Sequence, residues 1–127
     1  MIYCRTAQKD DLAIAAQQTI LLMRVKDEGY SLANIPIFID NGVNGATLDR
    51  PAFNQMNEVI RQGGVEAVYV MNHDRIGRDI IDVHNWLQEM ERMGIKVTGE
   101  DGETLNFISH ERLMQMIEEV QQWVARL

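Results

Sequence analysis

The chain has 127 residues, of which 46% are apolar, and its formal net charge at pH 7 is −7. A chain of this length forms one domain that buries a core without a metal or disulfides. The single cysteine, Cys4, excludes an internal disulfide and favours a reducing, cytoplasmic compartment. No apolar run approaches the roughly 20 residues of a membrane-spanning helix, so no membrane partner is expected.

The negative charge is unevenly distributed. From Asp79 onward there are ten acidic and four basic residues, whereas residues 1–78 contain nine acidic and eight basic ones. Binding to a nucleic-acid backbone depends on lysine and arginine, so the net charge argues against a general affinity for DNA. A local basic site in the first part of the chain remains compatible with the total.

The first third of the chain predicts two strands separated by a helix. Residues 1–6 are mostly apolar or β-branched and are predicted to form a short strand. Asp10 or Asp11 then offers an N-cap for a long helix that ends before Gly29. Residues 35–39 form the second strand.

The alternation continues to residue 98. Asn-Gly pairs indicate a loop over residues 40–49, and Pro51 marks the start of the next helix. The later elements are a helix ending near residue 62, a strand at 66–71, a helix at 79–93 and a strand at 95–98. The order βαβαβαβ predicts an α/β domain with a parallel sheet covered by helices on both faces.

The C-terminal part is expected to differ from this α/β core of residues 1–98. Residues 99–106 are polar and rich in glycine, which predicts a mobile loop over residues 99–108, and an amphipathic helix follows at 109–127. Its apolar stripe consists of Leu113, Ile117, Val120, Val124 and Leu127. The stripe has to be buried either against the chain's own sheet or against a second subunit.

Charged side chains follow two of the predicted strands. Arg5 ends the first strand, and Asp74, Arg75 and Arg78 follow the third. The carboxyl ends of parallel strands meet at one edge of a sheet, where ligands bind, so the three arginines are expected to converge. Guanidinium groups recognise phosphate and stabilise the charge that develops on a phosphoryl group.

The arginines and Gln17 also have purely structural interpretations, and the motifs typical of nucleotide-binding and metal-binding sites are absent from the sequence. Each arginine could instead pair with a nearby carboxylate such as Asp74 or Asp79. Gln17, in the first helix, could reach the same edge, although an exposed glutamine is the default. Neither a P-loop nor Gly-x-Gly-x-x-Gly follows the first strand, and the three histidines lack metal-ligand spacing. No cofactor or metal is therefore expected.

Five segments, in this order, resemble the catalytic domain of the serine recombinases, the resolvase and invertase family. They are Tyr3–Ala7, Ala13–Gln17, Phe38–Gly45, Arg50–Phe53 and Asp74–Asp79. The resemblance runs from the first residue to about Val97. It implies a single three-layer, resolvase-like domain over residues 1–127, with a mostly parallel sheet of four to five strands flanked by helices.

The resemblance also implies a chemistry. In this family a serine hydroxyl attacks a DNA phosphodiester, forms a phosphoserine link and allows the strands to be rejoined. The matching site residues here are Arg5, Arg75 and Arg78 around the phosphate, Gln17, Asp74 and Arg50 in support, and Asp40 and Asn44 in the substrate-binding stretch.

Three departures from the family pattern matter. The position of the nucleophilic serine holds Ala7, which has no hydroxyl, and Asn44 stands where the family usually has serine. Cys4 points away from Arg5 by strand alternation and Thr6 is β-branched, so neither is expected to replace the serine. The chain ends without a helix-turn-helix or zinc-binding DNA module.

These observations favour a relative that has lost cleavage and acts as a DNA-phosphate-binding or oligomerising module. Its expected partners are a second copy, bound through residues 109–127 as a dimer or higher oligomer, a full-length recombinase, or DNA held by another protein. One alternative is an active recombinase fragment whose serine was replaced artificially. The other is an α/β domain that binds a small phosphorylated ligand.

Overall fold

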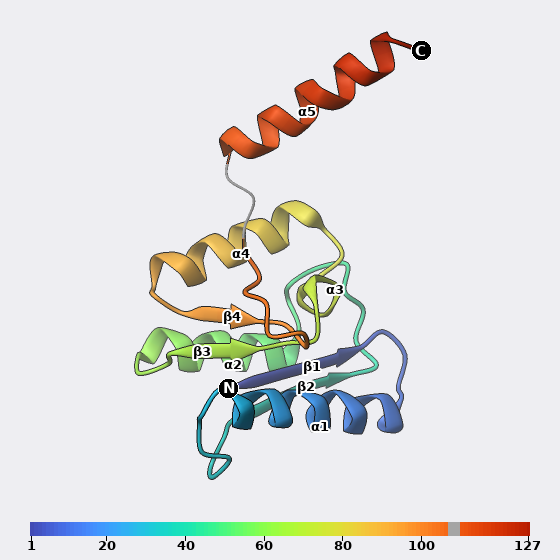
Figure 1. Cartoon of the computed structure of the whole chain (residues 1–127). Coiled ribbons are helices and arrows are strands. Elements are labelled where there is room, and N and C mark those ends of the chain that lie inside the picture. Colours follow the sequence, from blue (N-terminus) through green and yellow to red (C-terminus); the bar gives the residue numbers. More distant parts are fainter. Residues whose placement is uncertain (107–109) are drawn as a thin grey trace.

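A computed structural model describes residues 1–106 and 110–127. Its elements are β1 (Ile2–Thr6), α1 (Asp11–Asp27), β2 (Ile37–Asn41), α2 (Pro51–Gln62), β3 (Ala67–Tyr69), α3 (His73–Ile76), α4 (Ile80–Arg92), β4 (Lys96–Thr98) and α5 (His110–Ala125). The strands form one parallel sheet in the order β2-β1-β3-β4 (Figure 1). The predicted α/β fold is confirmed, with four strands.

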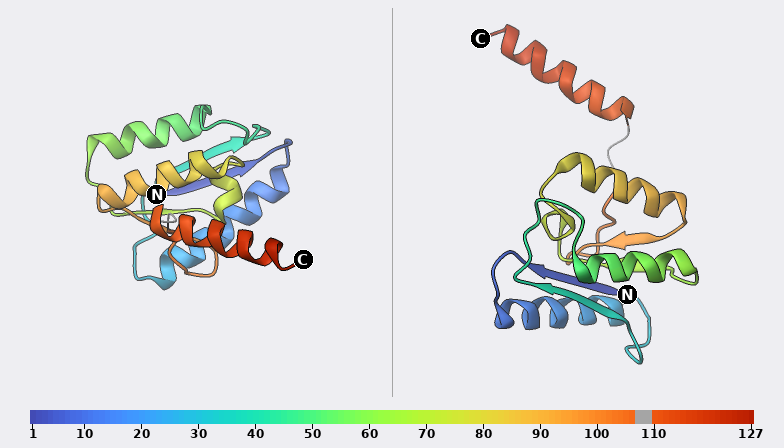
Figure 2. Two further views of the ribbon diagram at one scale, coloured as in Figure 1. Left: turned by 90° about the horizontal axis from the view of Figure 1, so that it is seen from above. Right: turned by 180° about the vertical axis from the view of Figure 1, so that it is seen from behind.

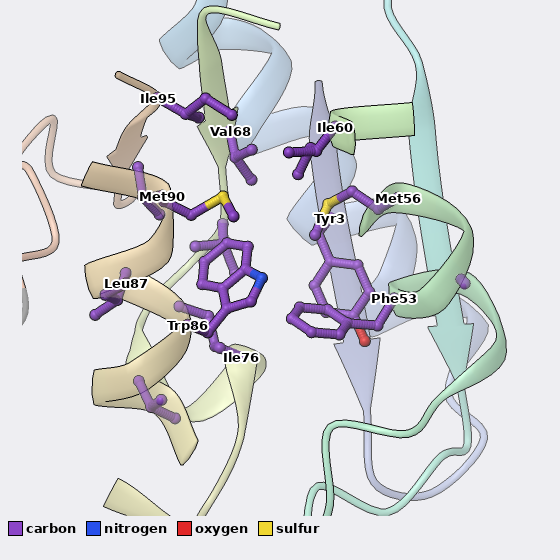
Figure 3. Close-up of a cluster of buried hydrophobic side chains, with 14 residues drawn as sticks. Tyr3, Phe53, Met56, Ile60, Val68, Ile76, Trp86, Leu87, Met90 and Ile95 are labelled. Atoms are coloured by element: carbon purple, nitrogen blue, oxygen red, sulfur yellow. The ribbon is translucent and has the colours of Figure 1, made fainter. Parts of the chain in front are cut away.

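The helices cover the sheet on both faces (Figure 2). On one face, α1 packs against β1 and β3 through Ile14, Leu21 and Val25. On the other face, α2 and α4 enclose a larger core (Figure 3). In that core the ring of Phe53 lies 5.2 Å from Tyr3 and 5.3 Å from Trp86, centroid to centroid, so aromatic packing joins both helices to β1.

Local signals set the helix ends much as predicted. The side chain of Asp10 accepts a hydrogen bond from the backbone N–H of Ala13 and caps α1. Asp79 caps α4 by accepting from the N–H groups of Ile81 and Asp82. Pro51 occupies the first turn of α2, where its missing N–H costs no helical hydrogen bond.

The strand ends differ from the prediction. The strand expected at residues 66–71 covers only Ala67–Tyr69. Val70 stays buried and donates to the carbonyl of Thr98, but the ladder between β1 and β3 pairs Ile2 with Tyr69 and goes no further. Beyond this point the one-turn helix α3, which the sequence did not predict, packs against β1.

Residues 99–106 form a hydrogen-bonded turn, which their polar composition did not predict. The N–H of Gly99 donates to Glu103 over 2.9 Å, and the N–H of Leu105 donates to Val97 over 2.8 Å. Thr98 and Thr104 form an antiparallel bridge. The turn therefore runs back alongside β4 before the chain reaches α5.

Helix α5 projects away from the α/β body (Figures 1 and 2). Every side chain from Arg112 to Leu127 is exposed, including the apolar stripe. Packing of this stripe against the chain's own sheet is therefore wrong, and packing against a second subunit stays a prediction. The predicted helix start at Ser109 lies outside the described residues. In the described ranges no helix is long and apolar enough to cross a membrane.

Candidate functional site

The arginines gather at the carboxyl edge of the two central strands. Arg5 ends β1, and α3 with its C-terminal extension carries Arg75 and Arg78 just beyond β3. The chain passes from β1 to β2 on one side and then returns to β3 on the other, so this edge is a topological switch point, where α/β sheets bind ligands.

Arg5 is buried, with only 3% of its surface exposed, and its guanidinium donates to three backbone carbonyls. Nε donates to Arg75 over 3.1 Å, Nη1 to Val43 over 3.0 Å and Nη2 to Asp74. Gly45 lies against it so closely that an added Cβ would be 2.7 Å from Nη2. Arg5 therefore joins the loop after β2 to α3.

Gln17 holds the backbone of Arg5 in place. Its Oε1 accepts from the N–H of Arg5 over 3.2 Å, and its Nε2 donates to the carbonyl of Arg5 over 3.0 Å. The side chain is 4% exposed. Gln17 does reach the predicted edge of the sheet. Its amide bonds both the N–H and the carbonyl of Arg5, as the backbone of a neighbouring strand would.

Arg50 lies beneath the site and is 1% exposed. Its Nη1 donates to the Tyr3 hydroxyl over 3.0 Å and to the carbonyl of Arg75 over 3.1 Å, and Nη2 donates to the carbonyl of Ile76. The guanidinium carbon lies 4.7 Å from the centroid of the Phe53 ring. Arg50 therefore holds α3 in place through hydrogen bonds to its backbone. Almost none of its surface is accessible to a ligand.

Asp40 is also part of the scaffold, with 3% exposure. Its carboxylate accepts from the Tyr3 hydroxyl over 2.7 Å and from the N–H groups of Ala52 and Phe53 over 2.9 and 3.0 Å. Arg50, the N-cap residue of α2, makes no capping bond with its side chain, so Asp40 caps this helix from a distance.

The outer layer of the site is open to solvent. Arg75 is half-buried. Its Nη1 donates to the backbone carbonyl of Arg5 over 3.2 Å, and its buried Nε has no hydrogen-bond partner in the described residues. Arg78 is exposed, and its Nη2 donates to Oδ1 of Asn44 over 2.7 Å. Asp74 and Ala7 are exposed as well, Ala7 in the bend that follows β1.

The alternative in which local carboxylates neutralise the arginines is wrong. Asp79 caps α4, and Asp74 offers Arg5 its backbone oxygen. The ion pairs in the described residues are Arg61–Glu58, Arg92–Glu89, Lys96–Glu28 and Arg112–Glu119. Within that part of the chain, the arginine cluster thus keeps its positive charge without a carboxylate in ion-pair contact.

Burial and mutual repulsion shape the titration of the cluster. Burial lowers the pKa of the Arg5 guanidinium, and the nearby charge of Arg50 lowers it further. Burial likewise lowers the pKa of Arg50, and raises the pKa of Tyr3 together with its hydrogen bond to Asp40. Because guanidinium stays protonated at physiological pH, a bound anion would relieve this repulsion.

Cavities and metal ligands add little to this site. A cavity of about 300 Å³ adjoins Arg78, between α3 and α4. A larger one, about 490 Å³, lies at the opposite ends of the strands beside Tyr30 and Tyr69, far from the arginines. Within residues 1–106 and 110–127, no three His, Cys, Asp or Glu side chains gather to hold a metal ion.

Three members of the site were not found from the sequence. Val43 contributes a backbone carbonyl and Gly45 contributes the space for the guanidinium of Arg5, and neither role depends on a functional side chain. Tyr3, whose hydroxyl links Arg50 to Asp40, has the appearance of an ordinary strand residue. The Asn-Gly pair at residues 44–45 was the available signal for a close backbone approach.

The fold and site together define a parallel α/β domain with a cluster of arginines at its switch point. A family model described as the resolvase N-terminal domain matches residues 1–127, and the chain belongs to this family. It is thus a resolvase-family catalytic domain of the serine recombinase type, which confirms the resemblance seen in its motifs.

Solved structures of this class share the fold. The N-terminal catalytic domain of TP901-1 integrase is similar over 98% of this chain and 95% of that one, with a TM-score of 0.73 and 19% identity. A resolvase family site-specific recombinase from Streptococcus pneumoniae has a TM-score of 0.68 and 23% identity, covering 98% of this chain and 89% of that one.

A third similar structure is the C-terminal catalytic domain of ISC1926 TnpA, an IS607-like serine recombinase. Its TM-score is 0.68 at 17% identity, over 98% of this chain and 82% of that one. A comparison with curated protein sequences found no significant match. At these identities the structures establish the shared fold, and the chemistry has to be argued from this chain's own residues.

Proposed function

We propose that this domain binds the phosphate backbone of DNA and does not cut it. One observation carries the proposal: the exposed Arg78 and the half-buried Arg75 lie beside the buried Arg5 and Arg50, and within the described residues no carboxylate forms an ion pair with any of the four. A phosphate diester has the charge and the acceptor geometry that such guanidinium groups bind.

The proposed loss of cleavage rests on the residues around position 7. Ala7 has no nucleophilic atom, and the neighbouring candidates are engaged elsewhere. Cys4 is fully buried, and burial raises the pKa of its thiol to about 12. The Thr6 hydroxyl donates to Asn41 over 2.8 Å and accepts from the N–H of Gly42 over 3.0 Å. No other hydroxyl or thiol takes the serine's place in the bend after β1.

Oligomerisation is the second part of the proposed function. The net charge of −7 opposes strong binding to DNA by a single copy, because few phosphates can be neutralised by one small basic site. The exposed stripe of α5 offers a surface for a second copy or for a full-length recombinase. Association would place two phosphate sites on one DNA molecule and raise the apparent affinity.

Fluorescence anisotropy with a labelled short DNA duplex tests the phosphate site. Replacing Arg78 by Gln is expected to weaken binding about ten-fold and to reduce the salt dependence by about one ion, because one phosphate contact is lost. Arg61→Gln is the matched control, since Arg61 is exposed and pairs only with Glu58. Equal losses in both variants would show that binding is non-specific and would overturn the proposal.

The second candidate function is DNA cleavage and rejoining, with the serine replaced artificially. The retained arginine cluster favours it. Ala7→Ser separates the two: a covalent protein–DNA adduct, seen as a band shift under denaturing conditions, would show that only the nucleophile is missing. Binding without an adduct supports a role confined to binding and assembly. Binding of nucleotides but not of duplex DNA would favour the small-ligand alternative.

A further inference from the structure

In this structure, oxygen atoms of the chain itself accept hydrogen bonds from the arginines of the cluster. Arg5 donates to the carbonyls of Val43, Asp74 and Arg75, all on the loop after β2 or on α3. Arg78 donates to the side-chain oxygen of Asn44 over 2.7 Å. Arg5 and Arg78 therefore each already have acceptors within the chain.

The two sets of acceptors differ in how easily they can be exchanged. Those of Arg5 are backbone carbonyls around a side chain that is 3% exposed. The acceptor of Arg78 is a neutral amide on an exposed loop residue, and Arg78 is itself exposed. An ionised oxygen forms a stronger hydrogen bond with guanidinium than a neutral amide does, so a phosphate would displace Asn44 before any other acceptor.

We propose that Asn44 is a positioning residue that competes with phosphate for Arg78 and that binding of DNA breaks their contact. This inference rests on the proposed function, because it assumes that Arg78 receives a DNA phosphate. Asn44 thus lowers the affinity of the site instead of adding a contact to the substrate. Asn44 lies in the loop between β2 and α2, so the contact that changes when phosphate binds is the one between this loop and Arg78.

Two other hydrogen bonds would hold the loop in place if the Arg78 side chain left Asn44. Oδ1 of Asn44 also accepts from the N–H of Ala46 over 2.7 Å, which closes a local turn. The backbone N–H of Arg78 donates independently to the carbonyl of Gly45 over 3.0 Å. Phosphate binding therefore needs only a rotation of the Arg78 side chain and leaves the path of the backbone unchanged.

Two substitutions separate competition from a merely structural role. Asn44→Ala removes the acceptor for both Arg78 and Ala46. Asn44→Ser is too short to hold Arg78 in the same way, but its hydroxyl can still accept from the N–H of Ala46. Asn54→Ala is the matched control, because the side chain of Asn54 donates to Asp49 at the end of the same loop.

The readout is the affinity for a short labelled DNA duplex, measured by anisotropy at fixed salt. We expect Asn44→Ser to bind about five-fold more tightly than the unmodified protein, as removal of one competing hydrogen bond predicts, and Asn54→Ala to leave affinity unchanged. A side-chain amide signal of Asn44 that shifts on adding DNA, in nuclear magnetic resonance spectra, supports the same conclusion.

The outcomes that contradict the inference are distinct. If the unmodified protein binds DNA and both Asn44 variants bind equally or more weakly, Asn44 does not compete and this inference fails alone. If Asn44→Ala binds more weakly but Asn44→Ser more tightly, the turn matters and the competition stands. If none of the proteins binds DNA, the proposed function fails and this inference fails with it.

Discussion

At the scale of single residues, the feature with the largest energetic cost is the buried guanidinium group of Arg50. Removing a charge from water costs several kcal/mol unless hydrogen bonds and nearby charges compensate. Arg50 meets this demand with two carbonyls, the Tyr3 hydroxyl and the face of the Phe53 ring. Tyr3 in turn donates to Asp40, so the positive and negative groups are connected through one hydroxyl.

Arg50→Met is therefore expected to destabilise the fold. The change leaves the buried carbonyls of Arg75 and Ile76 without this donor, at an expected cost of about 3 kcal/mol in the free energy of unfolding. Urea unfolding followed by circular dichroism provides the measurement. Arg61→Met serves as control, with an expected loss below about 1 kcal/mol, because its pairing with Glu58 is at the surface. Similar losses for the two variants would show that the buried network contributes little.

At the scale of elements, hydrogen bonds from Arg24 join α1 to the turn that follows β4. Arg24, in the last turns of α1, donates from Nε and Nη2 to the carbonyl of Glu100 over 3.3 and 3.1 Å. Gly102 lies against the same guanidinium, and an added Cβ there would be 2.9 Å from Nη1. The turn at residues 99–106 is thereby held against α1 as well as against β4.

Arg24→Met is expected to loosen this turn without unfolding the domain. Amide hydrogen exchange at Gly99 and Leu105, whose N–H groups are bonded within the turn, should become about five-fold faster, as loss of a hydrogen bond worth about 1 kcal/mol predicts. Exchange in α2 should not change. Arg92→Met, which removes an exposed pair with Glu89, should leave the turn as it is. Unchanged exchange at Gly99 and Leu105 in Arg24→Met would mean that β4 alone holds the turn.

At the scale of the whole molecule, α5 is the helix whose apolar face is left exposed in the described part of the chain. The large apolar side chains from Leu113 to Leu127 are between 38% and 88% exposed, with Met116 at the lower end and Leu127, just beyond the helix, at the upper. An amphipathic helix gains most of its stability from burying its apolar face, so a helix left in water in this way implies a surface for association. The exposed stripe therefore supports the proposed oligomer.

Sedimentation equilibrium tests this association. The unmodified protein is expected to form dimers or larger oligomers at micromolar concentration, and Ile117→Asp, in the middle of the stripe, should shift it to monomers by placing a charge in an apolar interface. Gln122→Asp adds the same charge on the opposite side of the helix and should have no effect. A monomer at all concentrations, or equal effects of both substitutions, would contradict the proposed interface.

The sequence by itself determined the order of the elements, because caps, glycines and apolar runs act locally. Asp10 and Asp79 cap helices within three residues of themselves, and Pro51 starts a helix, so their roles follow from short segments. The motifs around Arg5 and Arg75 likewise identified the family and the edge of the sheet where the arginines meet. The parallel order of the strands followed from the alternation of strands and helices.

Only the tertiary structure decided which of these residues are open to solvent. Arg5, Arg50 and Asp40 are buried by partners 12 to 70 positions away, and most of those partners are backbone groups. A backbone carbonyl or N–H is the same in every residue, so nothing in the sequence marks it as a partner. For this reason the sequence identified the arginines but could not distinguish Arg78, which is open to solvent, from Arg5, whose hydrogen bonds are directed inward.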